Sequence, residues 1–442
     1  MFTVRKILFL KFHRFYRKVN MEIYNIITLI VVLTAIFGYV NHRFFKLPRT
    51  IGIMLISLLA SLVVVGIGII FPEFFFQTIQ AISLIDFQTV LLRVMLSFLL
   101  FAGAIHIDSK RLRKERTSII TFASIGVIIS TFVIGSLLYL TTHLFGLSVN
   151  YLYCLLFGAL ISPTDPIAVI GILEKAKIPS SLETKISGES LFNDGVGVVL
   201  FIMFLQIAQI GLENISVWQI IWLFFREAGG GILFGWLLGY IGYAALKSID
   251  NYVVEVMITI AIVMGGYSMA EIMHLSGPLA MVMAGLITGN KSMDVIVSDV
   301  TRDYIGKFWE MIDEVMNAIL FLLIGFEMLV IPFNFTLLWL GCITIVIVLV
   351  GRLISVSLPI LFLIKYKNYF RRNSIPILTW GALRGGISVA LALAVPKYMY
   401  GDMFVSITYV VVLFSIVAQG LTIGKFAKKL AENEDELPNI IS

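Results

Sequence analysis

The chain has 442 residues, of which 59% are apolar and 14% are charged, and its formal net charge is +6. Soluble domains have about 45–50% apolar and about 25% charged residues, so this composition excludes a soluble enzyme, a nucleic-acid-binding protein and a disordered chain. It predicts a polytopic membrane protein. The two cysteines, Cys154 and Cys342, are too few for a disulfide framework or a cysteine-based metal cluster.

The N-terminal residues 1–20 carry six basic side chains and no acidic one. Within them, residues 8–19 place apolar side chains on one helical face with basic side chains beside it. This pattern predicts an amphipathic segment that lies on a membrane surface. The alternative is that translation starts at Met21, directly before the first apolar stretch.

Thirteen apolar stretches follow, and a helix of about 20 such residues crosses a bilayer. They are residues 23–41, 50–71, 87–107, 118–140, 148–173, 188–210, 218–246, 252–271, 277–289, 308–330, 335–364, 374–396 and 403–424. No soluble domain interrupts them, and a short tail, 426–442, follows. The predicted fold is therefore an all-α polytopic membrane protein with about 13 transmembrane helices.

The loop charges predict the orientation of these helices. The odd-numbered connections and the C-terminal tail hold 22 lysines and arginines, against 2 in the even-numbered connections. The positive-inside rule therefore places the C-terminus in the cytoplasm and the N-terminus outside the cell (inner) membrane. The basic residues 1–20 conflict with this orientation, because they would lie on the outer side.

Two predicted spans are interrupted. In the fifth, Pro163 and Pro166 lack backbone N–H donors, so the helix must break there, and Asp165 is suited to cap a second half-helix. In the twelfth, three glycines between positions 381 and 386 surround Arg384. Two broken helices in corresponding positions predict inverted repeats whose broken helices cross near the membrane midplane. Asp165 and Arg384 would then offset the partial charges of the half-helix ends.

The sixth span begins with a polar cluster. Ser190 and Asp194 are four residues apart and share one helical face, while Glu189 and Asn193 share a face about 100° away. Such a set of oxygen ligands suits a small monovalent cation, and a carboxylate in a partly dry site can hold either a proton or that cation. The alternative is a polar patch that only packs helices together.

Three motifs carry a resemblance to a known family: Thr164-Asp165-Pro166, Glu189-Ser190-Leu191-Phe192-Asn193-Asp194-Gly195 and Gly381-Ala382-Leu383-Arg384-Gly385-Gly386. Together they resemble the monovalent cation/proton antiporters, specifically the NhaP-like bacterial branch related to the animal sodium/proton exchangers. The resemblance implies a secondary active antiporter, not an enzyme, that exchanges sodium or lithium for protons by alternating access without a cofactor. Potassium/proton exchange and a cation channel remain as alternatives.

The resemblance also implies a domain organisation within residues 21–425. Spans four to six (118–210) and eleven to thirteen (335–424) would form a moving core. Spans one to three (23–107) and seven to ten (218–330) would form the dimerisation domain of a homodimer. The partners implied are monovalent cations, protons and the lipid bilayer, and no nucleic acid.

By the same resemblance, Asp194 is the carboxylate that binds cation and proton. Ser190 and the backbone at Thr164 help to coordinate Na⁺, or Li⁺ or K⁺, and Asp165 belongs to the same site. Asn193 stands where the electrogenic branch has a second aspartate, which implies electroneutral exchange of one cation for one proton.

The resemblance further implies a buried ion pair of Glu189 with Arg384, and it matches Arg352 to another arginine of the eleventh span. One departure concerns the third span, where many relatives carry an acid and this chain has Ala102. Any contribution of that acid is then missing, unless His106 or Asp108 replaces it.

Overall fold

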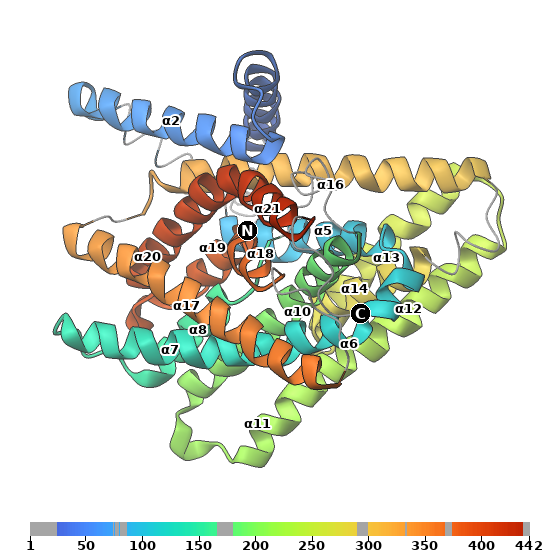
Figure 1. The fold of residues 1–442 in the computed structure, drawn as a ribbon. Helices are drawn as coiled ribbons and strands as arrows, with labels where there is room; N and C mark the ends of the chain where they lie inside the picture. The colour runs from blue at the N-terminus through green and yellow to red at the C-terminus, as the bar shows by residue number, and fades with distance from the viewer. Residues whose placement is uncertain are drawn as a thin grey trace, which may run out of the picture. The chain divides into compact units, whose positions relative to one another are not determined.

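The computed structural model describes residues 24–73, 75, 79, 86–165, 180–289, 299–331, 334–366 and 374–435. Within these ranges the secondary structure is helical, apart from one isolated antiparallel bridge between Asp165 and Leu383 (Figure 1). The predicted amphipathic segment 1–20 and the second half of the fifth span, 166–173, lie outside the described residues.

The chain divides into two compact units. The first contains residues up to 86 together with Ala318–Val330. Its described helices are Tyr24–Phe45, which ends in the π-helical turn η1 (Asn41–Phe45), α2 (Arg49–Ile70), and the C-terminal part of α16 (Asp299–Glu327). Ile53 packs there against Ala318 and Leu322 of α16, and Ser61 donates a hydrogen bond to the Gly325 carbonyl at 2.9 Å.

The second unit contains Phe87–Asn317 and Ile331 onward. Its α-helices are α4 (Phe87–Thr89), α5 (Leu96–Ile105), α6 (Ser109–Thr121), α7 (Val127–Leu144), α8 (Tyr151–Ile161), α10 (Ser180–Ile210), α11 (Val217–Phe224), α12 (Gly230–Lys247), α13 (Tyr252–Ile272), α14 (Gly277–Ile287), the N-terminal part of α16, α17 (Phe335–Tyr366), α18 (Ser374–Trp380), α19 (Gly386–Leu393), α20 (Gly401–Phe414) and α21 (Gly420–Asp435). Short π-helical or 3₁₀ turns are η2 (Val90–Met95), η3 (Phe122–Gly126), η4 (Leu212–Asn214), η5 (Phe225–Gly229), η7 (Lys397–Met399) and η8 (Ser415–Gln419).

Each of the thirteen predicted apolar stretches corresponds to a helix, a run of consecutive helices or an interrupted helix in the described residues. Nine of these helices are long and apolar enough to cross a membrane, and α8 and α14 are shorter apolar helices. The prediction of a polytopic all-α membrane fold is confirmed.

Polar residues at the connections explain where several helices begin. Asn150, Asn251 and Ser276 accept hydrogen bonds from the first free backbone N–H groups of α8, α13 and α14. Ser216 and Gln219 form a reciprocal capping box at the start of α11. These side chains satisfy donors that have no partner inside the helix.

Four helices extend at least eight residues beyond the predicted apolar stretches; among them, the sixth starts at Ser180 rather than 188 and the thirteenth ends at Asp435 rather than 424. The fourth helix starts at Ser109 rather than 118, because α6 continues through η3 into α7, and the tenth starts at Asp299 rather than 308. Hydropathy detects the part of a helix that lies in hydrocarbon. Charged turns can continue the same helix outside the hydrocarbon, but they are not apolar. A search for apolar stretches therefore does not detect them.

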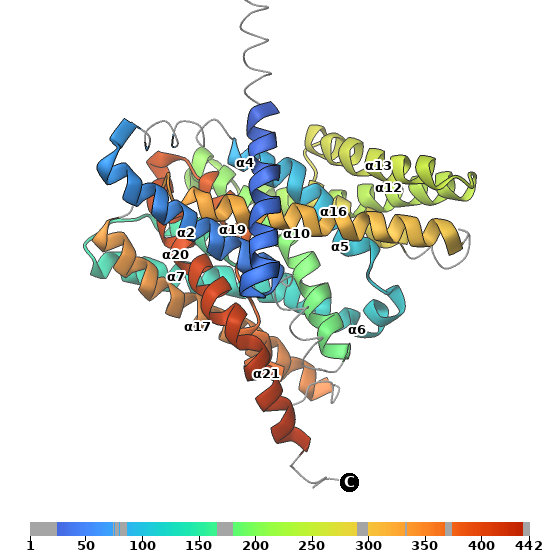
Figure 2. The same ribbon diagram turned by 90° about the horizontal axis from the view of Figure 1, so that it is seen from above.

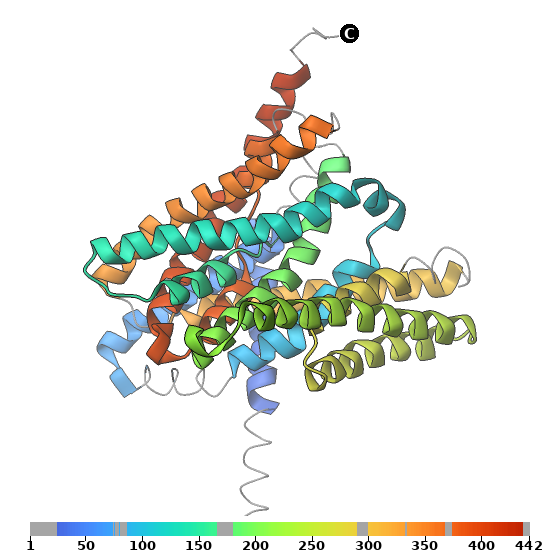
Figure 3. The same cartoon turned by 90° about the horizontal axis from the view of Figure 1, so that it is seen from below.

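Glycines allow close packing around α8. A Cβ atom at Gly158 would lie 2.2 Å from the Thr131 carbonyl oxygen, and one at Gly135 would lie 2.9 Å from the Cys154 carbonyl oxygen. The backbones of α7 and α8 therefore approach closely, as small residues permit between membrane helices. On its other side α7 runs beside α17 (Figure 3), and α12 packs beside α13 (Figure 2).

Candidate functional site

The two helix breaks meet in the second unit. α8 ends at Ile161 and is followed by residues without helical structure up to Asp165, while α18 ends at Trp380 and α19 begins at Gly386. The Asp165 N–H donates a hydrogen bond of 2.8 Å to the Leu383 carbonyl. The two breaks predicted from the sequence therefore lie against each other.

Gly385 is required for this close approach. A Cβ atom at this position would lie 2.3 Å from Oδ2 and 2.8 Å from Cβ of Asp165. No side chain fits between these two breaks. The glycine-rich sequence around Arg384 thus serves the contact between the breaks as well as the interruption of the helix.

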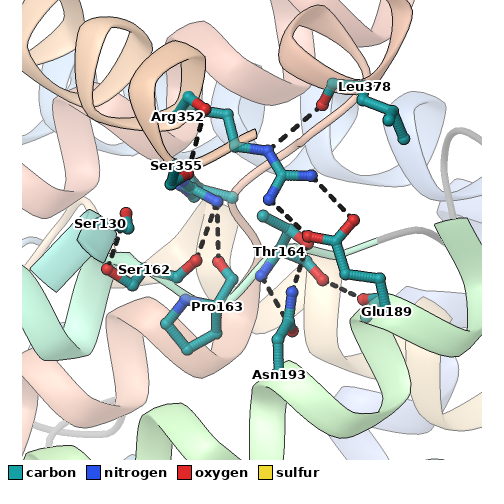
Figure 4. A network of polar contacts seen from close by, with 11 residues as sticks. Ser130, Ser162, Pro163, Thr164, Glu189, Asn193, Arg352, Ser355 and Leu378 are labelled. Carbon is teal, nitrogen blue, oxygen red and sulfur yellow. Dashed lines mark hydrogen bonds and ion pairs between the residues drawn. The ribbon is translucent and has the colours of Figure 1, made fainter. Parts of the chain in front are cut away.

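α10 holds the first break through Thr164. The Ser190 hydroxyl donates a short hydrogen bond to the Thr164 carbonyl oxygen. Nδ2 of Asn193 donates to the Thr164 hydroxyl at 2.8 Å (Figure 4). The Thr164 N–H donates in turn to Oδ1 of Asn193 at 3.4 Å. The structure thus brings together Thr164, Ser190 and Asn193, and the amide of Asn193 is engaged on both of its polar atoms.

Asp194 lies one helical turn beyond Ser190 and is 8% exposed. Within the described residues, its carboxylate forms no hydrogen bond or ion pair. It lies near enough to Asp165 for the two carboxylates to interact electrostatically. A buried carboxylate without a fixed cationic partner is costly in the charged form, so it is stabilised by a bound proton or a bound cation.

Glu189 pairs with Arg352 of α17. Nη1 and Nη2 of Arg352 lie 2.5 Å and 3.0 Å from the two carboxylate oxygens of Glu189, and both side chains are almost completely buried (Figure 4). Nε of Arg352 also donates to the Leu378 carbonyl at 3.2 Å, in the last turn of α18. This bidentate ion pair, together with the hydrogen bond to Leu378, connects α10, α17 and α18.

The predicted ion pair of Glu189 with Arg384 is therefore wrong. Nη1 of Arg384 donates to the carbonyls of Ser162 and Pro163 at 3.1 Å and 3.2 Å, at the end of α8. There the cation offsets the negative end of the helix dipole, as predicted for a half-helix end. Among the described residues, Arg352 and Arg384 are the buried arginines, and the sequence alone did not indicate which of them reaches Glu189.

Several polar residues of this region were not predicted from the sequence. The Ser415 hydroxyl accepts the Arg384 N–H at 2.8 Å and donates to Oε1 of Gln419 at 2.7 Å, and Nε2 of Gln419 donates to the Trp380 carbonyl at 3.0 Å. Ser162 donates to the Ser130 hydroxyl at 3.0 Å. Their one signal in the sequence is that they are polar residues inside apolar spans.

The two residues suggested as replacements for the missing acid at Ala102, His106 and Asp108, lie at helix ends. Ala102 is fully buried in α5. Oδ1 of Asp108 accepts the backbone N–H groups of Lys110 and Arg111 at 2.8 Å and 3.4 Å, so this carboxylate caps α6. His106 is exposed at the end of α5.

Comparisons with known proteins agree with this architecture. Residues 30–429 match the model of a family described as "Sodium/hydrogen exchanger, transmembrane". The chain is 47% identical to the Na(+)/H(+) antiporter NhaP of Pseudomonas aeruginosa, over 92% of this chain and 96% of that protein. It is 34% identical to the Na(+)/H(+) antiporter NhaH of Halobacillus dabanensis, over 78% of this chain and 84% of that protein.

A solved structure shows the same fold. It is that of the sodium proton antiporter MjNhaP1 from Methanocaldococcus jannaschii, with a TM-score of 0.71 and 18% sequence identity. The match covers 94% of this chain and 98% of that one. The two broken helices and the polar cluster of α10 thus belong to a chain whose fold and sequence both point to the same group of membrane proteins.

Proposed function

The chain belongs to the sodium/hydrogen exchanger family, and from this we propose that it is a secondary antiporter that exchanges sodium ions for protons across the cell (inner) membrane. The observation that carries the proposal is the buried Asp194 carboxylate, which no cationic side chain of the described residues neutralises. The curated relatives named above carry the activity in their names.

The exchange follows from competition for one carboxylate. A cation that binds Asp194 displaces its proton, and a proton that binds releases the cation. Ser190 and Thr164 supply neighbouring oxygen atoms for a sodium ion whose water shell is partly removed, with Asp165 nearby. Movement of the site between the two membrane faces by alternating access then couples the two fluxes.

Electroneutral exchange is supported by the partners of the neighbouring groups. Asn193 carries no charge and its amide is engaged with Thr164. Glu189 is neutralised by Arg352. With Asp194 as the group that exchanges its proton, one proton moves for one monovalent cation and no net charge crosses the membrane.

The wider assembly is part of the same proposal. Spans four to six and eleven to thirteen form the moving core, the remaining spans form the dimerisation domain, and the protein is a homodimer with a cytoplasmic C-terminus and an external N-terminus. The homodimer and this division of the spans rest on the family resemblance of the sequence. Cross-linking in the membrane tests the dimer, and protease access to a tag fused after Ser442 tests the orientation.

The test of function uses the purified full-length protein in proteoliposomes that contain a pH-sensitive dye. Addition of sodium should release protons from acid-loaded vesicles at a rate that saturates with sodium concentration, and an imposed membrane potential should leave that rate unchanged. Vesicles with Asp194→Asn protein are the matched control. Cation flux without opposed proton flux would instead identify a channel, and activity with potassium in place of sodium would identify a potassium/proton antiporter.

A further inference from the structure

The first turns of α6 carry a basic surface outside the site described above. Five basic side chains within seven positions are exposed: Lys110, Arg111, Arg113, Lys114 and Arg116. α6 is the N-terminal part of a continuous helix that leads through η3 and α7. We call this exposed group the α6 basic face.

The single acid of α6 does not neutralise this face, because it points into the protein. Glu115 is 5% exposed, and its Oε2 lies 3.4 Å from Nζ of Lys185 on α10, which is itself buried. The nearby Asp108 is used in capping α6, and it also pairs with Arg111 at 3.5 Å. The exposed side of α6 is therefore cationic.

The length of the helix places this face at the membrane surface. The continuous helix from Lys110 to Leu144 has 35 residues. At about 1.5 Å per residue it is roughly 52 Å long, whereas the hydrocarbon core is about 30 Å thick. Because residues 118–140 form the apolar stretch, the charged turns at 110–116 extend into the layer of lipid headgroups.

The α6 basic face is in register with a surface that faces lipid chains. Arg113 and Ile120 are seven residues apart within α6, so they lie on one side of the helix. Ile120 and Ile125 are 59% and 53% exposed. One side of the helix thus changes from cationic to apolar in the order in which a phospholipid changes from headgroup to acyl chain.

We propose that the α6 basic face binds the headgroups of anionic phospholipids. Lysine and arginine attract phosphate groups electrostatically, and clusters of four to eight such residues next to a membrane helix are typical of contacts with anionic lipids. The exposed isoleucines favour a lipid over a free phosphate ion, because they offer contacts to acyl chains. On its buried side, α6 contacts α10, the helix that carries Asp194, through Glu115 and Lys185.

The test measures thermal unfolding of the full-length protein in detergent with added lipid, so it does not depend on transport activity. Phosphatidylglycerol should raise the unfolding temperature, whereas phosphatidylcholine and inorganic phosphate at the same concentration should not. Lys110→Gln/Arg113→Gln/Lys114→Gln should require more phosphatidylglycerol for the same shift. Since each lost charge weakens binding about fivefold, we expect a decrease in affinity on the order of 100-fold.

The matched control removes three charges elsewhere. Lys425, Lys428 and Lys429 of α21 are also exposed, and their replacement by glutamine should leave the shift unchanged. Lys110→Arg/Arg113→Lys/Lys114→Arg keeps the charges and should keep the shift, and high salt should abolish the shift of the unmodified protein.

An undiminished shift in the glutamine variant would overturn the proposal. So would an equal shift with phosphatidylcholine or inorganic phosphate. If the glutamine variant does not fold, the salt titration and the charge-retaining variant decide, and a shift that resists high salt would count against the proposal.

Discussion

Two carboxylates on α10 show how the same chemical group can serve two purposes. Glu189 is 2% exposed and Asp194 is 8% exposed, and they lie within two turns of one helix. Arg352 binds both oxygens of Glu189, whereas no described side chain forms an ion pair with Asp194. A buried carboxylate with a fixed counterion is a structural element, and one without a fixed counterion depends on ions from solution.

The largest expected effect is on Asp194. Asp194→Asn removes the charge for which cation and proton compete, so exchange in proteoliposomes should fall to the rate of empty vesicles. Insertion and thermal unfolding should stay near those of the unmodified protein, because the carboxylate forms no hydrogen bond or ion pair with the described residues. Clear residual exchange would mean that a different group carries the proton.

Substitutions of Glu189 and Arg352 should lower the stability of the protein, whereas Asp194→Asn should leave it almost unchanged. Glu189→Ala and Arg352→Ala each leave one buried charge without its partner, which costs about 3–5 kcal/mol. The double variant should lose less than the two single losses together, as measured by denaturant or thermal unfolding in detergent. Strict additivity would show that the two side chains do not interact.

A second double-mutant cycle, with Glu189→Ala and Arg384→Ala, compares the coupling of Glu189 to Arg384 with its coupling to Arg352. Arg384 binds backbone carbonyls at the end of α8 rather than Glu189. The coupling energy should therefore be smaller than that of Glu189 with Arg352. A larger coupling would restore the pair that the sequence predicted.

Gly385→Ala should have an intermediate effect. The added Cβ would lie 2.3 Å from Oδ2 of Asp165, so the two breaks must separate, and such overpacking costs about 1–3 kcal/mol. Exchange should slow as well, because Asp165 borders the proposed site. Gly265→Ala in α13 is the control, since a Cβ there meets no atom within 4 Å and stability should not fall. Equal behaviour of the two variants would contradict the close contact of the breaks.

The smallest effect is expected at Gln419. Gln419→Met keeps the side-chain volume but removes the hydrogen bonds to Ser415 and to the Trp380 carbonyl, at a cost of about 1 kcal/mol for each bond. The exposed Gln209 on α10 provides the control, because a surface Gln209→Met should change stability little. Unfolding temperature is the measurement, and a larger loss than for Gly385→Ala would show that these hydrogen bonds matter more than the close contact of the breaks.

The sequence alone was sufficient to predict the membrane helices and the positions of the two helix breaks. Hydropathy identifies a helix in lipid because every backbone polar group there must be satisfied within the helix. Pro163 and the glycines around Arg384 mark the breaks through their effect on the backbone. The spacing of Ser190 and Asp194 predicts a shared face, whereas the contacts of Ser190 and Asn193 with Thr164 were found in the structure and not predicted.

The partners of the buried charges could not be obtained in the same way. Arg352 and Arg384 are both cations in apolar spans, and their pairing depends on how α17 and the second break approach α10. That approach is set by packing between segments distant in sequence, since Glu189 and Arg352 are 163 residues apart. The bonds of Ser415 and Gln419 depend on the same packing, and no spacing rule within one helix describes it.

The contact of the two breaks also has a consequence for biogenesis. Ser162 and Arg384 lie 222 residues apart, so most of the protein must leave the ribosome before the carbonyls at the end of α8 meet their cation. Until then Glu189 also lacks Arg352, and the polar turn of α10 enters the bilayer without either partner. A nascent chain that ends before α17 therefore exposes an unneutralised carboxylate to lipid and should be a preferred substrate for membrane quality-control proteases. Synthesis of the C-terminal spans would supply Arg352 and Arg384 and so end this exposure.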